Sequence, residues 1–223
     1  MKKLIAVIGL DNFGLTICRT LANLKTEVLG IDIDRNLISQ LSDQLDNLVV
    51  ADATHINALR ELGIDKYDNV VVGITKNLEA SILTLMNLKE LGVKKITVRV
   101  DYEKYINIFE RLGADEIIIP DQDSGISLAN KLINESFMEY YPVADGFGII
   151  KIKAPKFFVP RTLIELDSRN SFDVNIVALI KKDGFIIPKG LDMVEASDIV
   201  IVIGDTEKLY IFEKFITSSK KVV

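Results

Sequence analysis

Residues 4–14 read LIAVIGLDNFG, and this stretch decides the fold. An unbroken apolar run meets Gly9, and a helical pattern begins just after Asp11. Such an order predicts a buried strand, a sharp turn and a helix, which together open a βαβ unit. Gly9 permits the turn, and Gly14 lets the helix pack closely against the strand.

The same stretch fits most of a dinucleotide-binding fingerprint. In that motif the amides at the helix N-terminus face a phosphate, and an acidic residue ending the next strand binds the ribose. Asp32 stands at that position, and its charge also disfavours a 2′-phosphate, so NADP is not expected. Asp11 departs from the motif, because it replaces the second glycine, which lets the backbone approach the pyrophosphate.

The Asp11 carboxylate leaves two interpretations open. At about 5 Å from a phosphate charge it would cost on the order of 3 kcal/mol at an effective dielectric constant of about 20. The turn is then either purely structural with reduced nucleotide affinity, or it keeps the nucleotide with a bridging cation or displaced phosphates.

Composition narrows the classes of function. The 223 residues are 48% hydrophobic and 26% charged, which excludes a disordered chain. The net charge of −5 argues against a nucleic-acid binder. With Cys18 as the single cysteine and His55 as the single histidine, neither a disulfide framework nor His-based catalysis is expected. The longest charge-free run, Ala80–Leu88, is too short for a membrane helix, so we expect a cytoplasmic protein.

Short apolar runs alternate with helical patterns through the first 120 residues. The predicted strands cover residues 4–8, 27–31, 47–50, 69–72, 95–98 and 116–119. The predicted helices cover residues 13–24, 35–45, 56–62, 78–91 and 102–112. The strands have a near-continuous content of Val, Ile and Leu rather than an alternating pattern, which indicates that both faces are covered. This order predicts an α/β, Rossmann-like, doubly wound parallel sheet.

The pattern changes after Pro120. Residues 124–141 read as one long helix that stops at Pro142. Beyond it we expect strands at 147–152, 174–180, 185–187 and 199–203, a hairpin turn at 182–184 and a last helix at about 207–216. We place the boundary near residue 140, giving domains 1–140 and 141–223, the second a small α+β domain. Val174, Ile176, Ala178 and Ile180 alternate as one predicted buried face.

Several short blocks, in their order and spacing, resemble a known family. The whole chain is similar to the KtrA/TrkA-type RCK (KTN) proteins, the regulatory subunits of potassium transport systems. The blocks that carry the resemblance are Val7–Gly14, Gly30–Asp32, Ala51–Thr54, Val72–Asn77, Ala80-Ser81 and Leu112–Asp115 with Pro120. The length resembles KtrA, with one regulatory unit, rather than TrkA, with two in tandem.

The resemblance implies an RCK N-terminal nucleotide-binding domain and a TrkA-C-like C-terminal domain. Homodimers would form an octameric ring, held at the inner face of the membrane by an integral K⁺-translocating partner of the KtrB or TrkH kind. Binding of ATP, ADP or NAD(H) would reshape the ring and change K⁺ flux. The chain would then be a cytoplasmic regulatory protein, not an enzyme.

The resemblance also implies ligand-binding positions where the strands end. Residues of the first turn would face the phosphates, those after the second strand the ribose, and those after the third strand the adenine. In chain order the candidates are Gly9, Asp11, Asn12, Phe13, Gly14, Asp32, Ile33, Asp34, Asp52, Ala53, Ile74, Thr75, Lys76, Arg99, Asp101 and Tyr105. Asp121 stands where the family can carry an acidic residue associated with a divalent cation at the dimer interface.

One departure from the family lies in the first turn. KtrA-like members have Gly-Arg there, whereas this chain has Asp11-Asn12, and the family's arginine reaches phosphates and helps to tell ATP from ADP. Arg99 could compensate in part, or it could simply pair with Asp115 or Glu116.

Several other features of the sequence fit a purely structural interpretation as well as a functional one. His55 reads as a surface residue at a helix start. Asp121 and Asp123 could bind a cation or only favour a helix dipole. The segment around Asn175–Val177 and Pro188 falls where some relatives bind cyclic di-AMP, but its strand–turn–strand pattern is common. The apolar stripe of 124–141 suggests a dimer contact or an interdomain one.

Two other functions stay open. A small NAD-dependent oxidoreductase would need a substrate domain and a general acid, and the sequence offers neither pattern. A structural gating subunit that has lost nucleotide control is the other alternative, and Asp11 keeps it open.

Overall fold

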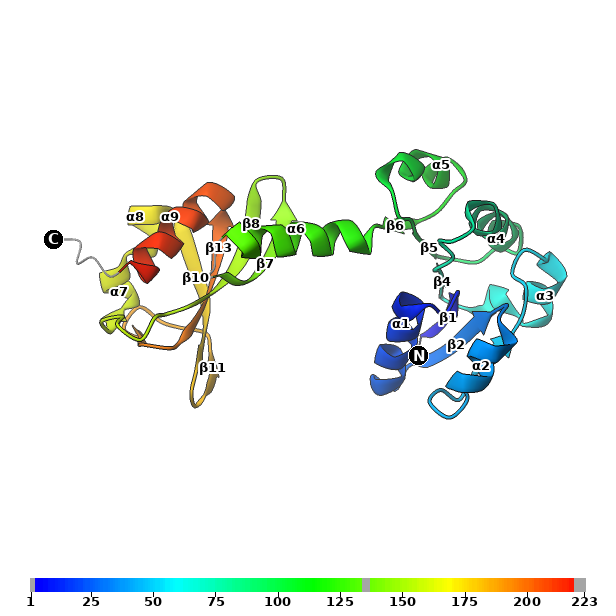
Figure 1. The fold of residues 1–223 in the computed structure, drawn as a ribbon, viewed down its shortest axis with the longest axis horizontal. Coiled ribbons are helices and arrows are strands. Elements are labelled where there is room, and N and C mark those ends of the chain that lie inside the picture. Colours follow the sequence, from blue (N-terminus) through cyan, green and yellow to red (C-terminus); the bar gives the residue numbers. More distant parts are fainter. Residues whose placement is uncertain (1–2, 134–136, 219–223) are drawn as a thin grey trace. The chain divides into compact units, whose positions relative to one another are not determined.

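The computed structural model describes residues 3–133 and 137–218. The chain divides into two compact units, Met1–Asp121 and Gln122–Val223 (Figure 1). Each unit has its own buried apolar core.

The first unit is an open parallel sheet. Its strand order is β3-β2-β1-β4-β5-β6, with every pairing parallel. The strands are β1 (Leu4–Ile8), β2 (Glu27–Asp32), β3 (Leu48–Val50), β4 (Asn69–Val72), β5 (Ile96–Arg99) and β6 (Glu116–Ile118). The chain order reverses direction between β1 and β4, which is where ligands bind in sheets of this kind. The predicted Rossmann-like parallel sheet is confirmed.

Helices cover both faces of this sheet. They are α1 (Asn12–Asn23), α2 (Arg35–Leu41), α3 (Ile56–Glu61), α4 (Leu78–Glu90) and α5 (Ile106–Arg111), with 3-10 turns η1 (Ile64–Lys66) and η2 (Glu103–Tyr105). Within β1, Ala6 and Ile8 belong to one apolar cluster and Val7 to another, because successive strand residues point to opposite faces. Two predicted helices differ from the structure. The helix predicted over 102–112 is divided into η2 and α5, and the helix predicted over 35–45 ends at Leu41.

Three glycines bring β1, α1 and β4 into backbone contact. Gly9 has a φ of 92°, in the left-handed region. A Cβ added to Gly14 would lie 2.0 Å from the carbonyl oxygen of Gly9, and one added to Gly73 would lie 3.1 Å from the same oxygen. The turn after β1 therefore tolerates no side chain at Gly14.

The second unit is an antiparallel sheet of order β11-β10-β13-β8-β7 with a two-stranded ladder of β12 and β9. Its elements are α6 (Pro120–Ile133, which begins at the end of the first unit), β7 (Phe137–Ala144), β8 (Phe147–Lys153), β9 (Arg161–Thr162), α7 (Leu163–Leu166), α8 (Ser168–Phe172), β10 (Val174–Lys181), β11 (Gly184–Ile186), β12 (Met193–Val194), β13 (Ile199–Asp205) and α9 (Thr206–Thr217). Leu209, Phe212 and Ile216 bury one face of α9 in this unit's core. The expected α+β domain and the hairpin of β10 and β11 are confirmed.

The single helix predicted over 124–141 is wrong. The helix α6 ends at Ile133, and Phe137–Ala144 form strand β7. Bulky aromatic residues such as Tyr140 and Tyr141 favour a strand, and Pro142 is tolerated because β7 is an edge strand. Residues 134–136 of the predicted helix lie outside the described residues.

The boundary between the two units lies at Asp121 and Gln122, earlier in the sequence than the predicted position near residue 140. The helix α6 bonds to the second unit, because the Ser127 hydroxyl donates to the Tyr140 carbonyl at 2.8 Å and the Tyr210 hydroxyl donates to Asn130. The division at Asp121 and Gln122 therefore assigns most of this helix to the second unit.

A bulge corrects the predicted buried face of β10. Val174, Ile176 and Ala178 are buried as expected, but Ile180 is only partly buried and Leu179 is fully buried. The pairing with β13 shifts by one residue between Ile176 and Ala178, so the alternation changes phase there. Across the described residues, no helix is long and apolar enough to cross a bilayer.

Candidate nucleotide-binding site

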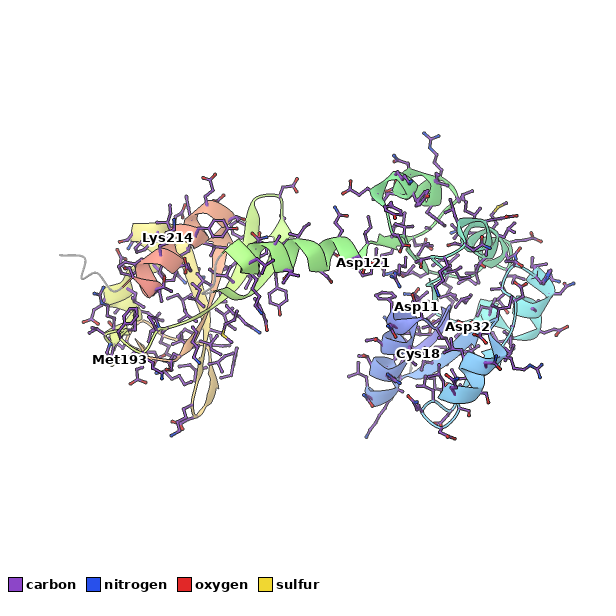
Figure 2. The ribbon with its side chains drawn as sticks, viewed as in Figure 1. Asp11, Cys18, Asp32, Asp121, Met193 and Lys214 are labelled. Carbon is purple, nitrogen blue, oxygen red and sulfur yellow. The ribbon has the colours of Figure 1, made fainter. Side chains whose placement is uncertain are left out.

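The main cavity of the first unit lies where the strands β1, β2, β3 and β4 end. Its volume is about 630 Å³, which is within the range of ligand pockets. Asp11 and Asp32 both line it and lie near each other in the first unit (Figure 2). Its apolar wall includes Ile33, Ala53 and Ile74.

Asp32 organises the turn between β1 and α1. One carboxylate oxygen accepts a hydrogen bond from the Leu10 amide at 2.7 Å, and the other accepts from the Asp34 amide at 2.9 Å. Asp34 then caps α2 by accepting from the amides of Asn36 and Leu37. Asp32 is therefore held at the mouth of the turn, where a ribose hydroxyl could replace or share these donors.

Asp52 and Asn87 fix the loop after β3. The Asp52 carboxylate accepts from the Thr54 hydroxyl at 2.7 Å and from the Thr54 amide at 2.9 Å, and these bonds lower the pKa of Asp52. The Asn87 side-chain amide, on α4, donates to the carbonyls of Ala53 and Thr54 at 3.1 and 2.9 Å. His55 is a surface residue as predicted, with its side chain 76% exposed.

Asp11 is the N-cap of α1. Its Oδ1 accepts from the amides of Phe13 and Gly14 at 3.0 and 3.1 Å. Its Oδ2 lies 2.8 Å from Nη1 of Arg99 on β5. The same carboxylate thus satisfies helix amides that would otherwise face a ligand, and it also neutralises the nearest guanidinium.

Arg99 is surrounded by carboxylates. Besides Asp11, Asp101 lies 3.8 Å and Asp121 lies 3.7 Å from Nη2, and the Phe13 ring lies 4.9 Å from the guanidinium carbon. The Arg99 side chain is only 11% exposed. This arrangement leaves little positive charge for another anion.

The alternative prediction, that Arg99 pairs with Asp115 or Glu116, is wrong. Asp115 accepts from the Ile96 amide at 2.8 Å and lies 3.8 Å from Lys89, and Glu116 pairs with Lys95 at 2.6 Å. Both acids therefore contact residues at the start of β5, whereas Arg99 lies at its end.

A second, smaller cavity of about 190 Å³ shares Ile74, Thr75 and Lys76 with the first. Arg99, Asp101 and Tyr105 also line it. Ser81 lines it too and is 2% exposed, and its hydroxyl has no hydrogen-bond partner within the described part of the chain. The Ser81 hydroxyl is therefore a buried, unsatisfied polar group in the wall of this cavity.

Comparison with known proteins identifies the family. Residues 5–120 match the TrkA-N domain, and residues 148–217 match the TrkA-C domain. The chain belongs to the TrkA-N/TrkA-C family. Ktr system potassium uptake protein C of Bacillus subtilis (strain 168) is 34% identical over 99% of this chain and 100% of its own length. Ktr system potassium uptake protein A of Vibrio alginolyticus is 32% identical over 93% and 94%.

Solved structures agree in fold with this TrkA-N/TrkA-C chain. A structure titled "GsuK Channel" has a TM-score of 0.69 at 14% identity and covers 99% of this chain. One titled "GsuK channel bound to NAD" has a TM-score of 0.67 at 12% identity. This chain spans 40% and 41% of those two chains.

Within the TrkA-N domain, most candidate residues line the two cavities. Those on the first cavity are Gly9, Asp11, Asp32, Ile33, Asp34, Asp52, Ala53, Ile74, Thr75 and Lys76, and those on the second also include Arg99, Asp101 and Tyr105. Asn12, Phe13, Gly14 and Asp121 line neither cavity. The backbone amides of Phe13 and Gly14 donate to Asp11, which lines the first cavity, whereas Asn12 is exposed on α1.

Sequence reasoning missed several residues of the TrkA-N site. Leu37, Thr54, Asn77, Glu79 and Leu83 line the first cavity, and Ser81, Tyr102 and Phe109 line the second. The start of α4 gave a signal, because Asn77 caps that helix and the cap places the next residues at the crevice.

The TrkA-N cavity fits the two halves of a nucleotide unequally. Asp32 and the apolar wall suit a ribose and an adenine. The phosphate half fits less well, because the Asp11 carboxylate already accepts from the amides of Phe13 and Gly14, and a phosphate would have to displace it or lie beside it.

Asp121, the candidate cation ligand, has a side chain that is 79% exposed and faces Arg99. Among the described residues, no group of three acidic, histidine or cysteine side chains could hold a metal ion.

Proposed function

We propose that this chain is the regulatory subunit of a potassium uptake system and that it acts through an adenine ligand bound in its TrkA-N domain. The observation that carries the proposal is the match to Ktr system potassium uptake protein C, which spans nearly the whole of both chains. Sequence similarity over the full length of both chains supports a shared function more strongly than similarity of fold alone would.

The ligand class rests on the first cavity. It lies at the reversal of strand order, and Asp32 stands at the end of β2, as in sites that bind a ribose. ATP, ADP and NAD(H) all carry that moiety, and one similar structure is titled as bound to NAD. Binding rather than catalysis is proposed, because the relatives that match nearly the whole chain are potassium uptake proteins.

The partner is an integral K⁺-translocating subunit of the KtrB or TrkH kind, which would hold the chain at the inner face of the membrane. Assembly into homodimers and an octameric ring belongs to the same proposal. Exposed apolar side chains on α6 support a subunit contact, since Ile126, Leu128 and Leu132 are 41%, 55% and 73% exposed. The ligand would bias the subunit arrangement and so change K⁺ flux.

Two finer expectations stay predictions. A divalent cation would bind at Asp121 only together with a second subunit, because Arg99 is its charged neighbour within the chain. Cyclic di-AMP binding near Asn175–Val177 would also need two C-terminal units.

The test is growth of bacterial cells that lack their own K⁺ uptake, at limiting K⁺, with the chain and a KtrB-like membrane subunit co-expressed. Growth should require both proteins. Asp32→Asn, in the cavity, should lower the growth rate, whereas Asp43→Asn, an exposed acid outside both cavities, should not. Growth that never depends on this chain would contradict the proposal.

A further inference from the structure

We infer that Asp11 is a specificity-determining residue, which makes the first cavity favour adenine ligands of low negative charge, such as adenosine or NAD⁺, over ADP and ATP. The inference rests on the proposed function and names the ligand class of that same site. It follows from where Asp11 lies and from the charges around it.

Asp11 occupies the place that a phosphate would take. Its Oδ1 accepts from the Phe13 and Gly14 amides at 3.0 and 3.1 Å, at the N-terminus of a helix of 12 residues. Those donors and the positive end of the helix are what binds phosphate in dinucleotide sites. A ligand phosphate must either displace this carboxylate or lie beside it.

The nearest cation is already paired. Asp11 Oδ2 lies 2.8 Å from Arg99 Nη1, while Asp101 and Asp121 lie 3.8 and 3.7 Å from Nη2. Three carboxylates therefore face one guanidinium. A phosphate that approached Arg99 would meet net negative charge, which costs more in a partly buried site than in water.

The charged residues that line the first cavity are mostly acidic as well. Among the described residues that line it, the charged ones are the acids Asp11, Asp32, Asp34, Asp52 and Glu79 and one base, Lys76. Adenosine carries no phosphate, and in NAD⁺ the pyridinium offsets part of the diphosphate charge. ADP and ATP add terminal phosphate charge that these carboxylates repel.

The experiment is isothermal titration of the full chain with adenosine, NAD⁺, ADP and ATP, without divalent cations. Wild type should bind adenosine and NAD⁺ more tightly than ADP, and ADP more tightly than ATP. Asp11→Asn keeps the capping oxygen and removes the charge, so it should tighten ATP binding by roughly 10- to 100-fold relative to adenosine. Adding Mg²⁺ should narrow the difference between ATP and adenosine in wild type.

Asp34→Asn is the matched control. Asp34 also caps a helix and lines the first cavity, but it forms no ion pair with Arg99. Asp34→Asn removes one carboxylate from the lining but leaves Asp11 on the Phe13 and Gly14 amides and paired with Arg99, so it should tighten ATP binding relative to adenosine by clearly less than Asp11→Asn does. Tighter binding of ATP than of adenosine by wild type would overturn the inference and leave nucleotide binding standing. Absence of binding by wild type and by Asp11→Asn would overturn both.

Discussion

The side-chain amide of Asn87 on α4 donates to the carbonyl oxygen of Ala53 in the loop after β3, at 3.1 Å. A second hydrogen bond from the same amide reaches the Thr54 carbonyl at 2.9 Å. One side chain thus holds the loop at which the adenine is expected to lie.

Asn87→Ala should loosen that loop. Two carbonyls lose their donor, so we expect a loss of about 1–2 kcal/mol in the free energy of unfolding, together with weaker ligand binding. Hydrogen exchange at residues 53–55 and urea unfolding would measure these effects. Asn57→Ala is the control, at an exposed asparagine on α3 that accepts only from exposed Arg60 at 2.6 Å, and it should change stability by less than about 0.5 kcal/mol and leave ligand binding unchanged. Equal effects from the two variants would contradict the role of Asn87.

Gly14→Ala should destabilise the first unit by more than about 3 kcal/mol. The added Cβ would lie 2.0 Å from the Gly9 carbonyl oxygen, and backbone cannot yield as a flexible side chain can. Thermal unfolding of the full chain would show the shift. Gly125→Ala is the matched substitution, because it lies in α6 with open space around it, and it should stabilise by about 0.5–1 kcal/mol.

Thr84→Val should leave stability unchanged or raise it by about 1 kcal/mol. Thr84 is fully buried on α4, and its hydroxyl has no hydrogen-bond partner in the part of the chain that the structure describes. Urea unfolding would measure the difference. Ser81→Ala should act similarly, because the Ser81 hydroxyl is also buried without a hydrogen-bond partner among the described residues. A loss above about 1 kcal/mol in Thr84→Val would show that its hydroxyl has a partner.

Cys18 should report on the pH dependence of stability. Burial raises the pKa of its thiol to about 11, above the value of about 8.5 in an unfolded chain. The thiol therefore contributes stability that is complete below the unfolded pKa and is lost as pH rises through the folded pKa.

The free energy of unfolding of wild type, minus that of Cys18→Ala, should accordingly fall by up to about 3 kcal/mol between pH 8 and pH 11. Urea unfolding at several pH values would measure it. The native thiol should also resist thiol reagents at pH 8 and react once urea unfolds the protein. A pH-independent difference between the two proteins would contradict this account.

Local sequence pattern predicted most of the fold. β1 and β4 have the predicted bounds, because each ends in an apolar run, Leu4–Ile8 and Val70–Val72, with a glycine directly after it. Strand β7 was missed because Phe137–Tyr141 continues the helical spacing of 124–133, and only its pairing with β8 makes it a strand. Pairing between strands depends on residues distant in sequence, which a local window does not include.

The candidate site was predicted in position more than in contacts. Asp32 and Asp52 lie where their strands end, as spacing requires. The partner of Arg99 was not predictable, because Asp11 lies 88 positions away and several nearer acids have the same chemistry. Asn87 was missed for a related reason, since nothing in a helix sequence tells which polar side chain faces a neighbouring loop.

The contact of Gly14 with Gly9 changes what the fingerprint in residues 9–14 can tell a reader. The outer two glycines are required because β1, α1 and β4 touch there, whether or not a ligand ever binds. The middle position holds Asp11, whose side chain caps α1 and pairs with Arg99, so this position sets the charge in the turn. In this chain the outer glycines set the close backbone packing of the turn, and the residue between them sets the charge that a bound ligand would meet.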